Sequence, residues 1–184
     1  MRTNNKGFTL TELLVSVVIF GVVLAAAFGL MLASAKSYNR VNDQLEIQTQ
    51  SQMALNLIQE YVIDCTGPIG NNQDELFIFR NQINEESNGK AEYEAVVFKV
   101  LDEELQIATD AKITRTVNEN GKMSYINTDY GNFFKVTDYV KKFSVSFDEK
   151  PIIIIELSME KRKASYTGEM RTALRNKPPQ VVIS

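Results

Sequence analysis

Apolar residues fill the N-terminal part of the chain almost without interruption. Between Leu13 and Ala33, Ser16 is the only residue with a polar side chain. As an α-helix this 21-residue run spans about 31 Å, which matches the hydrocarbon core of a bilayer. The pattern predicts a membrane-spanning helix. Gly21 and Gly29 fall inside it, where glycine permits close approach between helices or local unwinding.

The helical pattern continues beyond the apolar run. No proline occurs before Gly67-Pro68, and the residues between are adequate helix formers. Near the end of this stretch apolar residues recur at intervals of three and four, which gives the helix one apolar face. These residues are Ala54, Leu55, Ile58, Tyr61, Val62 and Cys65. We predict one long helix from about Thr9 to about Asp64, with its first half in the membrane and its end packed on a sheet.

From about Glu75 the pattern changes to short runs rich in branched and aromatic residues, which is typical of strands. The runs are ELFIFR, YEAVVFKVL, ELQIAT, KITRTV, KMSYIN, FKVT, VKKFSVSF, PIIIIELSME and EMRTALR. Asp102-Glu103 and residues 118–121 have the composition of hairpin turns. The fold class predicted is therefore α+β, a long N-terminal helix packed at its end on an antiparallel β-sheet head.

Individual segments of the head carry further expectations. Alternation in KFSVSF places Phe143, Val145 and Phe147 on one face of a strand, and the isoleucines at 152–155 predict a strand covered on both sides. Lys90 lies in a polar stretch expected to be an exposed loop. The closing residues NKPPQVVIS are expected to form a loosely held tail.

Charge is distributed unevenly along the chain. Residues 36–149 hold 11 Lys or Arg against 19 Asp or Glu, and residues 150–184 hold 7 against 3. An acidic middle with a mildly basic end argues against a dedicated nucleic-acid module, which would show a dense basic surface.

The residue types needed for most enzyme chemistry are missing from the sequence. The chain has no histidine, which removes the commonest general base and metal ligand. No cofactor motif or metal-ligand spacing occurs, so we expect no enzyme and no cofactor. Cys65 is the only cysteine, so it has no partner for an internal disulfide, and we expect it to be a small buried apolar residue.

The N-terminal segment has two general interpretations. Arg2 and Lys6 with Ala33-Ser34-Ala35 resemble a secretory signal and its cleavage site, but the apolar run is longer than usual and Glu12 is out of place in it. A plain single-pass anchor, with the N-terminus in the cytoplasm, explains the length. It does not explain a carboxylate at the edge of an apolar run, a costly position that normally marks a paired or functional group.

A third interpretation comes from the stretch KGFTLTELLVSVVIF. It closely resembles the prepilin signal of type IV pilins and of the pseudopilins of type II secretion and competence systems. The resemblance implies that Lys6 and Gly7 end a leader, that a prepilin peptidase cuts after Gly7, and that Phe8 becomes an N-methylated N-terminus. Glu12 then occupies the fifth mature position, preceded by Thr9 in the usual spacing. In the family this glutamate is thought to pair with the N-terminal amine of a neighbouring subunit, which gives it and Thr9 a role in assembly.

The same resemblance implies a domain plan and a function. The plan is a prepilin leader (1–7), a transmembrane half-helix (8–35), an extracytoplasmic half-helix (36–66) and a β-rich globular head with a short C-terminal tail (67–184). The layout, a "V..F.V.F" strand and the closing residues 174–176 resemble W-type minor pilins and J-type minor pseudopilins. The expected function is a structural subunit of a type IV pilus, competence pilus or type II secretion pseudopilus. It would be anchored in the inner membrane and, after assembly, extracytoplasmic. Its partners would be other subunits, the prepilin peptidase, the membrane assembly platform and the lipid bilayer.

The alternative function is a membrane-tethered binding module whose head recognises nucleic acid or a surface ligand. Residues 161–163, with Arg171, Arg175 and Lys177, would supply a basic strip for DNA. Clustered charges on a surface strand more often serve solubility or protect a sheet edge.

Overall fold

The computed structural model describes residues 9–63, 65, 67–72, 74–86, 89–117, 123–148, 152–176 and 180–182. The chain divides into two compact units, residues 1–42 and residues 43–184. One helix, α1 (Leu10–Ile63), begins in the first unit and ends in the second. The single long helix predicted from the sequence is thereby confirmed.

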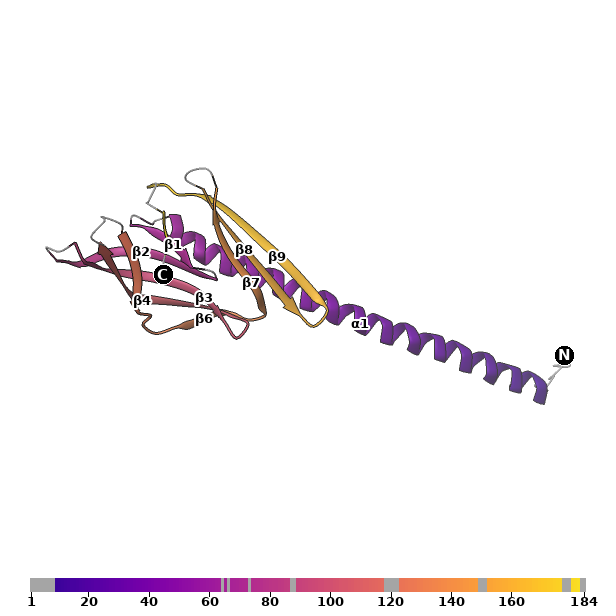
Figure 1. Cartoon of the computed structure of the whole chain (residues 1–184). Coiled ribbons are helices and arrows are strands. Elements are labelled where there is room, and N and C mark those ends of the chain that lie inside the picture. The colour runs from indigo at the N-terminus through magenta and orange to yellow at the C-terminus, as the bar shows by residue number, and fades with distance from the viewer. Residues whose placement is uncertain are drawn as a thin grey trace, which may run out of the picture. The chain divides into compact units, whose positions relative to one another are not determined.

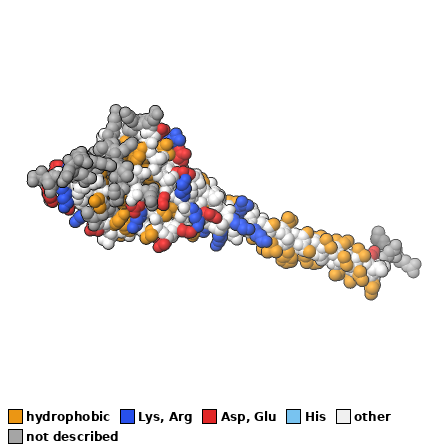
Figure 2. Space-filling model, viewed as in Figure 1, with side chains coloured by type: hydrophobic (Ala, Val, Ile, Leu, Met, Phe, Trp, Pro, Cys, Tyr) orange, Lys and Arg blue, Asp and Glu red, His pale blue; other side chains and the backbone are white. Residues whose placement is uncertain are grey.

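The first unit is helical from Leu10 onward, and all of its described side chains are exposed. Figure 2 shows hydrophobic side chains covering much of the visible surface of the N-terminal part of the helix. Within the described part of the chain, α1 is the one helix long and apolar enough to cross a membrane. No described residue covers this apolar stretch, and an apolar surface of this length calls for lipid or other helices around it.

The second unit begins with the buried face of α1. Its buried residues follow one another at intervals of three and four, as one face of a helix requires. They are Asp43, Ile47, Ser51, Ala54, Leu55, Ile58 and Val62. The apolar members pack against residues of both sheets in one continuous core. This confirms that the end of the helix packs on a β-rich head.

The described residues form two sheets, and the larger has seven strands. Figure 1 labels β1, β2, β3, β4 and β6 of this sheet. Six follow the order β10-β1-β2-β3-β4-β5, and β6 pairs separately with β4. All pairs are antiparallel except β1 with β10, which is parallel. The strands are β1 (Ile69–Asn72), β2 (Glu75–Glu85), β3 (Ala91–Leu101), β4 (Glu104–Val117), β5 (Met123–Asp129), β6 (Phe134–Thr137) and β10 (Gln180–Val182).

The smaller sheet is an antiparallel meander in the order β7-β8-β9. Its strands are β7 (Val140–Phe147), β8 (Ile152–Lys161) and β9 (Ala164–Ala173). Gly168 of β9 lies so close to α1 that an added Cβ would come within 2.6 Å of the Ser51 hydroxyl oxygen. The absence of a side chain at this position therefore lets the strand approach the helix.

The larger sheet is buried on both faces. One face joins α1 and the smaller sheet in the main core. The opposite face forms a second, aromatic-rich cluster. There Phe79 makes edge-to-face contacts with Tyr93 and Tyr125, at ring-centroid distances of 5.5 and 5.3 Å.

Most predicted strands are observed, with several differences in their limits. ELQIAT and KITRTV form one strand, β4, and β9 begins five residues before the predicted EMRTALR. Asp102 and Glu103 both have positive φ in the two-residue turn between β3 and β4, as the hairpin prediction requires. The turn predicted at 118–121 lies outside the described residues, between paired strands β4 and β5.

Three expectations about individual segments had different outcomes. Phe143 and Val145 are buried on one face and Phe147 packs against the same core, as predicted. The isoleucine strand is not covered equally on both sides, because residues 153 and 155 are fully buried while 152 and 154 are only partly buried. The tail is not loose throughout, since residues 180–182 form strand β10 against β1.

Candidate functional site

The N-terminal end of α1 is closed by a reciprocal pair of hydrogen bonds. Thr9 precedes the first helical residue, and its hydroxyl oxygen accepts the N–H of Glu12 at 3.3 Å. The N–H of Thr9 donates to Oε2 of Glu12 at 2.9 Å. This arrangement is a capping box, in which a threonine and a glutamate three residues later satisfy donors that the first helical turn leaves unpaired.

The Glu12 carboxylate is held on one side only. The Thr9 hydroxyl also donates to Oε2, at 2.8 Å, and contacts the Thr11 hydroxyl at 3.0 Å. Within the described residues no hydrogen bond reaches Oε1, and Glu12 is exposed. A shallow cavity of about 330 Å³ opens beside the carboxylate, lined by Thr11, Glu12, Val15 and Ser16. A cationic donor can therefore reach this carboxylate without breaking the helix.

Two further features suit this end of the helix to an apolar environment. The Ser16 hydroxyl donates to the backbone carbonyl of Glu12 at 2.7 Å, so the single polar side chain of the apolar run is satisfied within the helix. Glu12 also lies in the first turn, where a negative charge interacts favourably with the helix dipole.

The structure brings together two of the residues that the sequence singled out, Thr9 and Glu12. The other three, Lys6, Gly7 and Phe8, lie outside the described residues. Sequence reasoning assigned Glu12 to an intermolecular partner and missed its contact with Thr9. The signal was nevertheless present, because T-x-x-E ahead of an apolar run is a capping-box pattern.

The proposed basic strip is mostly occupied by ion pairs. Lys161 pairs with Glu46 at 2.5 Å and lies 3.9 Å from Asp43, while Arg162 pairs with Asp43 at 3.2 Å. Both acidic residues belong to α1, so the basic turn between β8 and β9 is fastened to the helix. The Glu46 carboxylate, by hydrogen bonding to Lys161, raises the pKa of that ammonium group.

The remaining basic residues do not form a continuous basic surface. Arg171 pairs with Glu169 on the same strand at 2.5 Å, and this hydrogen-bonded carboxylate raises the pKa of the guanidinium group. Lys163 and Arg175 are exposed, and Lys177 lies outside the described residues. The structure therefore gives the nucleic-acid hypothesis little free positive charge at this place.

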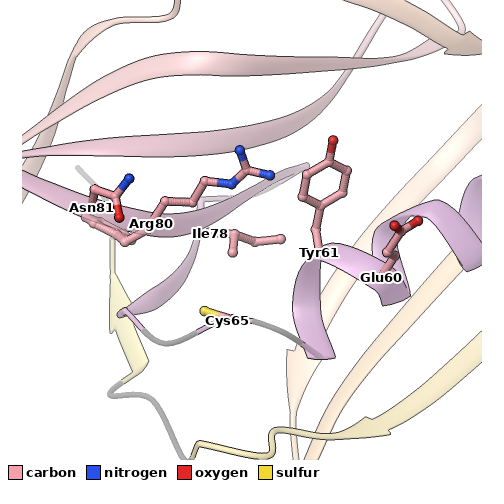
Figure 3. A pocket seen from close by; sticks show the side chains of 7 residues that line it. Glu60, Tyr61, Cys65, Ile78, Arg80 and Asn81 are labelled. Atoms are coloured by element: carbon pink, nitrogen blue, oxygen red, sulfur yellow. The ribbon is translucent and has the colours of Figure 1, made fainter.

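Cys65 lies just after α1, in the wall of a cavity of about 360 Å³ (Figure 3). It is buried, as predicted, and its thiol donates to the carbonyl of Gly67 at 3.1 Å. Burial raises the pKa of the thiol to about 11. The thiol is therefore protonated and unreactive near neutral pH. Arg80 and Tyr61 also line the cavity, and the Arg80 guanidinium carbon lies 5.0 Å from the ring centroid of Tyr61.

Among the described residues, no group of three or more Cys, Asp or Glu side chains is arranged to hold a metal ion. The candidate site is thus a helix end with an accessible carboxylate, suited to binding a cationic group.

Comparison with known proteins gives one match. Residues 2–28 match the family described as the prokaryotic N-terminal methylation motif. No curated protein and no solved structure matches the chain.

Proposed function

We propose that this chain, whose N-terminal methylation motif supports the type IV pilin and pseudopilin family, is a minor structural subunit of a pilus or pseudopilus. The motif indicates a substrate of a prepilin peptidase, and it points to a structural protein. The long apolar helix together with the motif suggests anchoring in the inner membrane. The α+β architecture of one long helix and a β-sheet head is pilin-like.

The observation that supports an assembly role most directly is the open side of Glu12. Cleavage after Gly7 would give Phe8 a free amine, methylated and cationic, four residues before Glu12. In a bilayer, a carboxylate with one unpaired oxygen is costly, and a charge-assisted hydrogen bond from a neighbouring subunit's amine would relieve that cost. Thr9 would hold the carboxylate in place for this partner through the contacts with Oε2.

The domain plan inferred from the sequence fits this function. Residues 1–7 would be removed, residues 8–35 would lie in the membrane with the N-terminus in the cytoplasm, and residues 36–66 would carry the head. The head would begin at residue 67 and reside outside the cytoplasm. Other pilin or pseudopilin subunits and the membrane assembly platform would be the partners. Resemblance to the W-type and J-type classes favours a role in initiation or at the tip.

The decisive experiment is the identification of the mature N-terminus. We expect protein isolated from membranes of cells that contain the prepilin peptidase to begin with N-methyl-Phe8, as measured by mass spectrometry. The variant Gly7→Asp should keep the leader, because the residue before the cut is changed, whereas Thr3→Asp inside the leader should be processed normally. An intact Met1 in the unmodified chain, or a start at Lys36, would contradict the proposal.

The alternative of a tethered nucleic-acid-binding module receives no support from a specific contact. Of the basic residues that would carry it, Lys161, Arg162 and Arg171 are paired with Glu46, Asp43 and Glu169. We therefore keep the structural role as the proposed function.

A further inference from the structure

Lys36 and Arg40 are the first charged residues after the apolar run of α1. Both are exposed, and both lie in the first unit. Because four residues separate them, their side chains lie on about the same face of the helix. In Figure 2, blue Lys and Arg side chains begin where the orange hydrophobic covering of the helix ends. The end of the apolar run therefore carries two neighbouring cations.

Neither cation has a carboxylate partner in the first unit. Glu12 is the only acidic residue among residues 1–42, and it precedes Lys36 by about 36 Å along the helix. The next two carboxylates in the sequence, Asp43 and Glu46, pair with basic residues of the second unit. Among the described residues, no ion pair includes Lys36 or Arg40. Both are free to bind an anion from outside the chain.

The spacing along the helix places the two cations at the surface of a bilayer. The hydrocarbon core is about 30 Å thick, and the headgroups add roughly 5–7 Å on each side. With Glu12 at one edge of the core, Lys36 lies about 6 Å beyond the opposite edge and Arg40 about 12 Å beyond it. Helical side chains tilt toward the N-terminus of their helix, which directs both cations back toward the bilayer. Both can therefore reach the phosphate groups of lipids.

The residues around the two cations also suit a membrane surface. Tyr38 lies between them in the sequence and on the opposite side of the helix, and it is 72% exposed. Tyrosine is enriched at membrane–water interfaces, where its ring is apolar and its hydroxyl stays hydrated. Residues 34–42 include no acidic residue, so this segment does not repel a negatively charged surface.

We propose that Lys36 and Arg40 bind the phosphate groups of anionic phospholipids in the leaflet that the chain crosses on its way to the head. The guanidinium group binds a phosphate through two parallel hydrogen bonds, and the ammonium group adds a second positive charge beside it. These contacts fix the depth of this end of the helix in the membrane. The inference rests on the membrane anchoring of the proposed function and does not depend on assembly into a fibre.

Lipid is a better partner for these cations than a second copy of the first unit. In two parallel copies at the same depth, Lys36 and Arg40 of one copy lie at the height of the same two residues of the other, where like charges repel. Glu12, the only carboxylate that the first unit of a second copy offers, would require a shift of about 36 Å along the helix to reach Lys36.

The test measures which lipids lie next to position 38. The chain has no tryptophan, so Tyr38→Trp introduces a single fluorophore between the two cations. The full chain with this substitution is reconstituted into phosphatidylcholine vesicles containing equal fractions of either phosphatidylglycerol or phosphatidylcholine brominated in the upper part of the acyl chains. Bromine quenches a neighbouring tryptophan, so the two quenching curves give the relative affinity for the anionic lipid. We expect phosphatidylglycerol to be preferred at least about fivefold, and the preference to disappear in about 1 M salt.

Three variants of the Tyr38→Trp chain separate these two cations from the total charge. Lys36→Gln with Arg40→Gln should lose the preference for phosphatidylglycerol and keep the quenching by brominated phosphatidylcholine. Lys163→Gln with Arg175→Gln is the matched control and should keep the preference, because it removes two exposed cations of the head. Lys36→Arg with Arg40→Lys should also keep it, since both positions stay cationic.

Equal quenching by the two brominated lipids, or a preference that survives Lys36→Gln with Arg40→Gln, would overturn the proposal and leave membrane anchoring intact. A preference lost equally in the Lys163 and Arg175 control would overturn it too. Quenching by neither lipid would show that this part of the helix is not at a bilayer, which contradicts both the anchoring and the proposal. Reduced incorporation of the Lys36 and Arg40 variant into fibres, with unchanged lipid preference, would assign these cations to a contact between subunits instead.

Discussion

Asp43 on the buried face of α1 forms an ion pair with Arg162, in the turn between β8 and β9, and its Oδ2 accepts a hydrogen bond from Nη1 at 3.2 Å. Asp43 is only 7% exposed, and Lys161 approaches it from the same turn. This pairing joins residues that are 119 positions apart in the chain. Two of the three charges in the most basic run of the head are therefore paired with carboxylates on the helix, Arg162 with Asp43 and Lys161 with Glu46.

Replacing Asp43 should destabilise the head more than replacing Lys163, the exposed residue next to Arg162. Asp43→Ala leaves Arg162 and Lys161 without this carboxylate, and we expect a loss of about 2 kcal/mol in the free energy of unfolding. Lys163→Ala, in the same turn, should change it by less than about 0.5 kcal/mol. Urea unfolding of the full chain in detergent measures both. Equal effects of the two changes would show that the ion pair contributes nothing specific.

Glu12 can be tested with two substitutions that separate its charge from its capping role. Glu12→Gln keeps an oxygen that can accept from Thr9 but removes the charge, whereas Glu12→Ala removes both. Both variants should insert in the membrane and be processed, yet be incorporated into sheared fibres at least about tenfold less than the unmodified subunit. Quantitative immunoblotting of fibre and membrane fractions measures this. Normal incorporation of Glu12→Gln would show that capping, and not charge pairing, is the function of this residue.

The close approach of β9 to α1 predicts a strict requirement for glycine at position 168. A Cβ there would lie 2.6 Å from Oγ of Ser51 and 2.8 Å from Cδ1 of Leu55. Gly168→Ala should therefore cost about 1–3 kcal/mol of stability through overpacking. Gly29→Ala, where nothing lies within 4 Å of the added atom, is the control and should not lower the stability of the head.

Ser51 should modulate the effect of the Gly168 change. Its hydroxyl is buried without a hydrogen-bond partner among the described residues, so Ser51→Ala alone should be neutral or slightly stabilising. In the double variant Ser51→Ala with Gly168→Ala, the loss should be smaller than in Gly168→Ala, because one of the two close contacts is relieved. Thermal unfolding of the unmodified chain, the two single variants and the double variant gives the coupling free energy between the two positions. If the stability changes of the two single variants simply add in the double variant, the close contact between position 168 and Ser51 is contradicted.

Cys65 gives the head a defined pH dependence. Its pKa is about 11 in the folded chain, against an ordinary value of 9.0. Between these values the folded state keeps the proton and the unfolded state loses it, so stability must fall as the pH rises from about 9 to 11. Urea midpoints measured across this range should decline more steeply for the unmodified chain than for Cys65→Ala. Parallel curves for the two proteins would show that the thiol is not protected by burial.

Much of the architecture could be read from local patterns. The helix was predictable over its whole length, because continuous helix formers and the absence of proline act within a few turns. Strands β6 and β7 were predicted with their observed limits, since branched and aromatic residues cluster there. β1 and β10 were missed. IGNN has few strand-forming residues, and QVV is only three residues long and depends on parallel pairing with the distant β1.

The sequence by itself determined that the chain begins with a long apolar helix, carries Glu12 at its edge and continues into a strand-rich head, because these features depend on neighbouring residues. Only the tertiary structure decided what the charged residues contact. Arg162 was assigned to a basic surface and instead pairs with Asp43, and Lys161 of the same run pairs with Glu46. Side-chain partners depend on which elements the fold brings within a few ångströms. Among the described residues, the sheet order likewise decides that β9 is an edge strand.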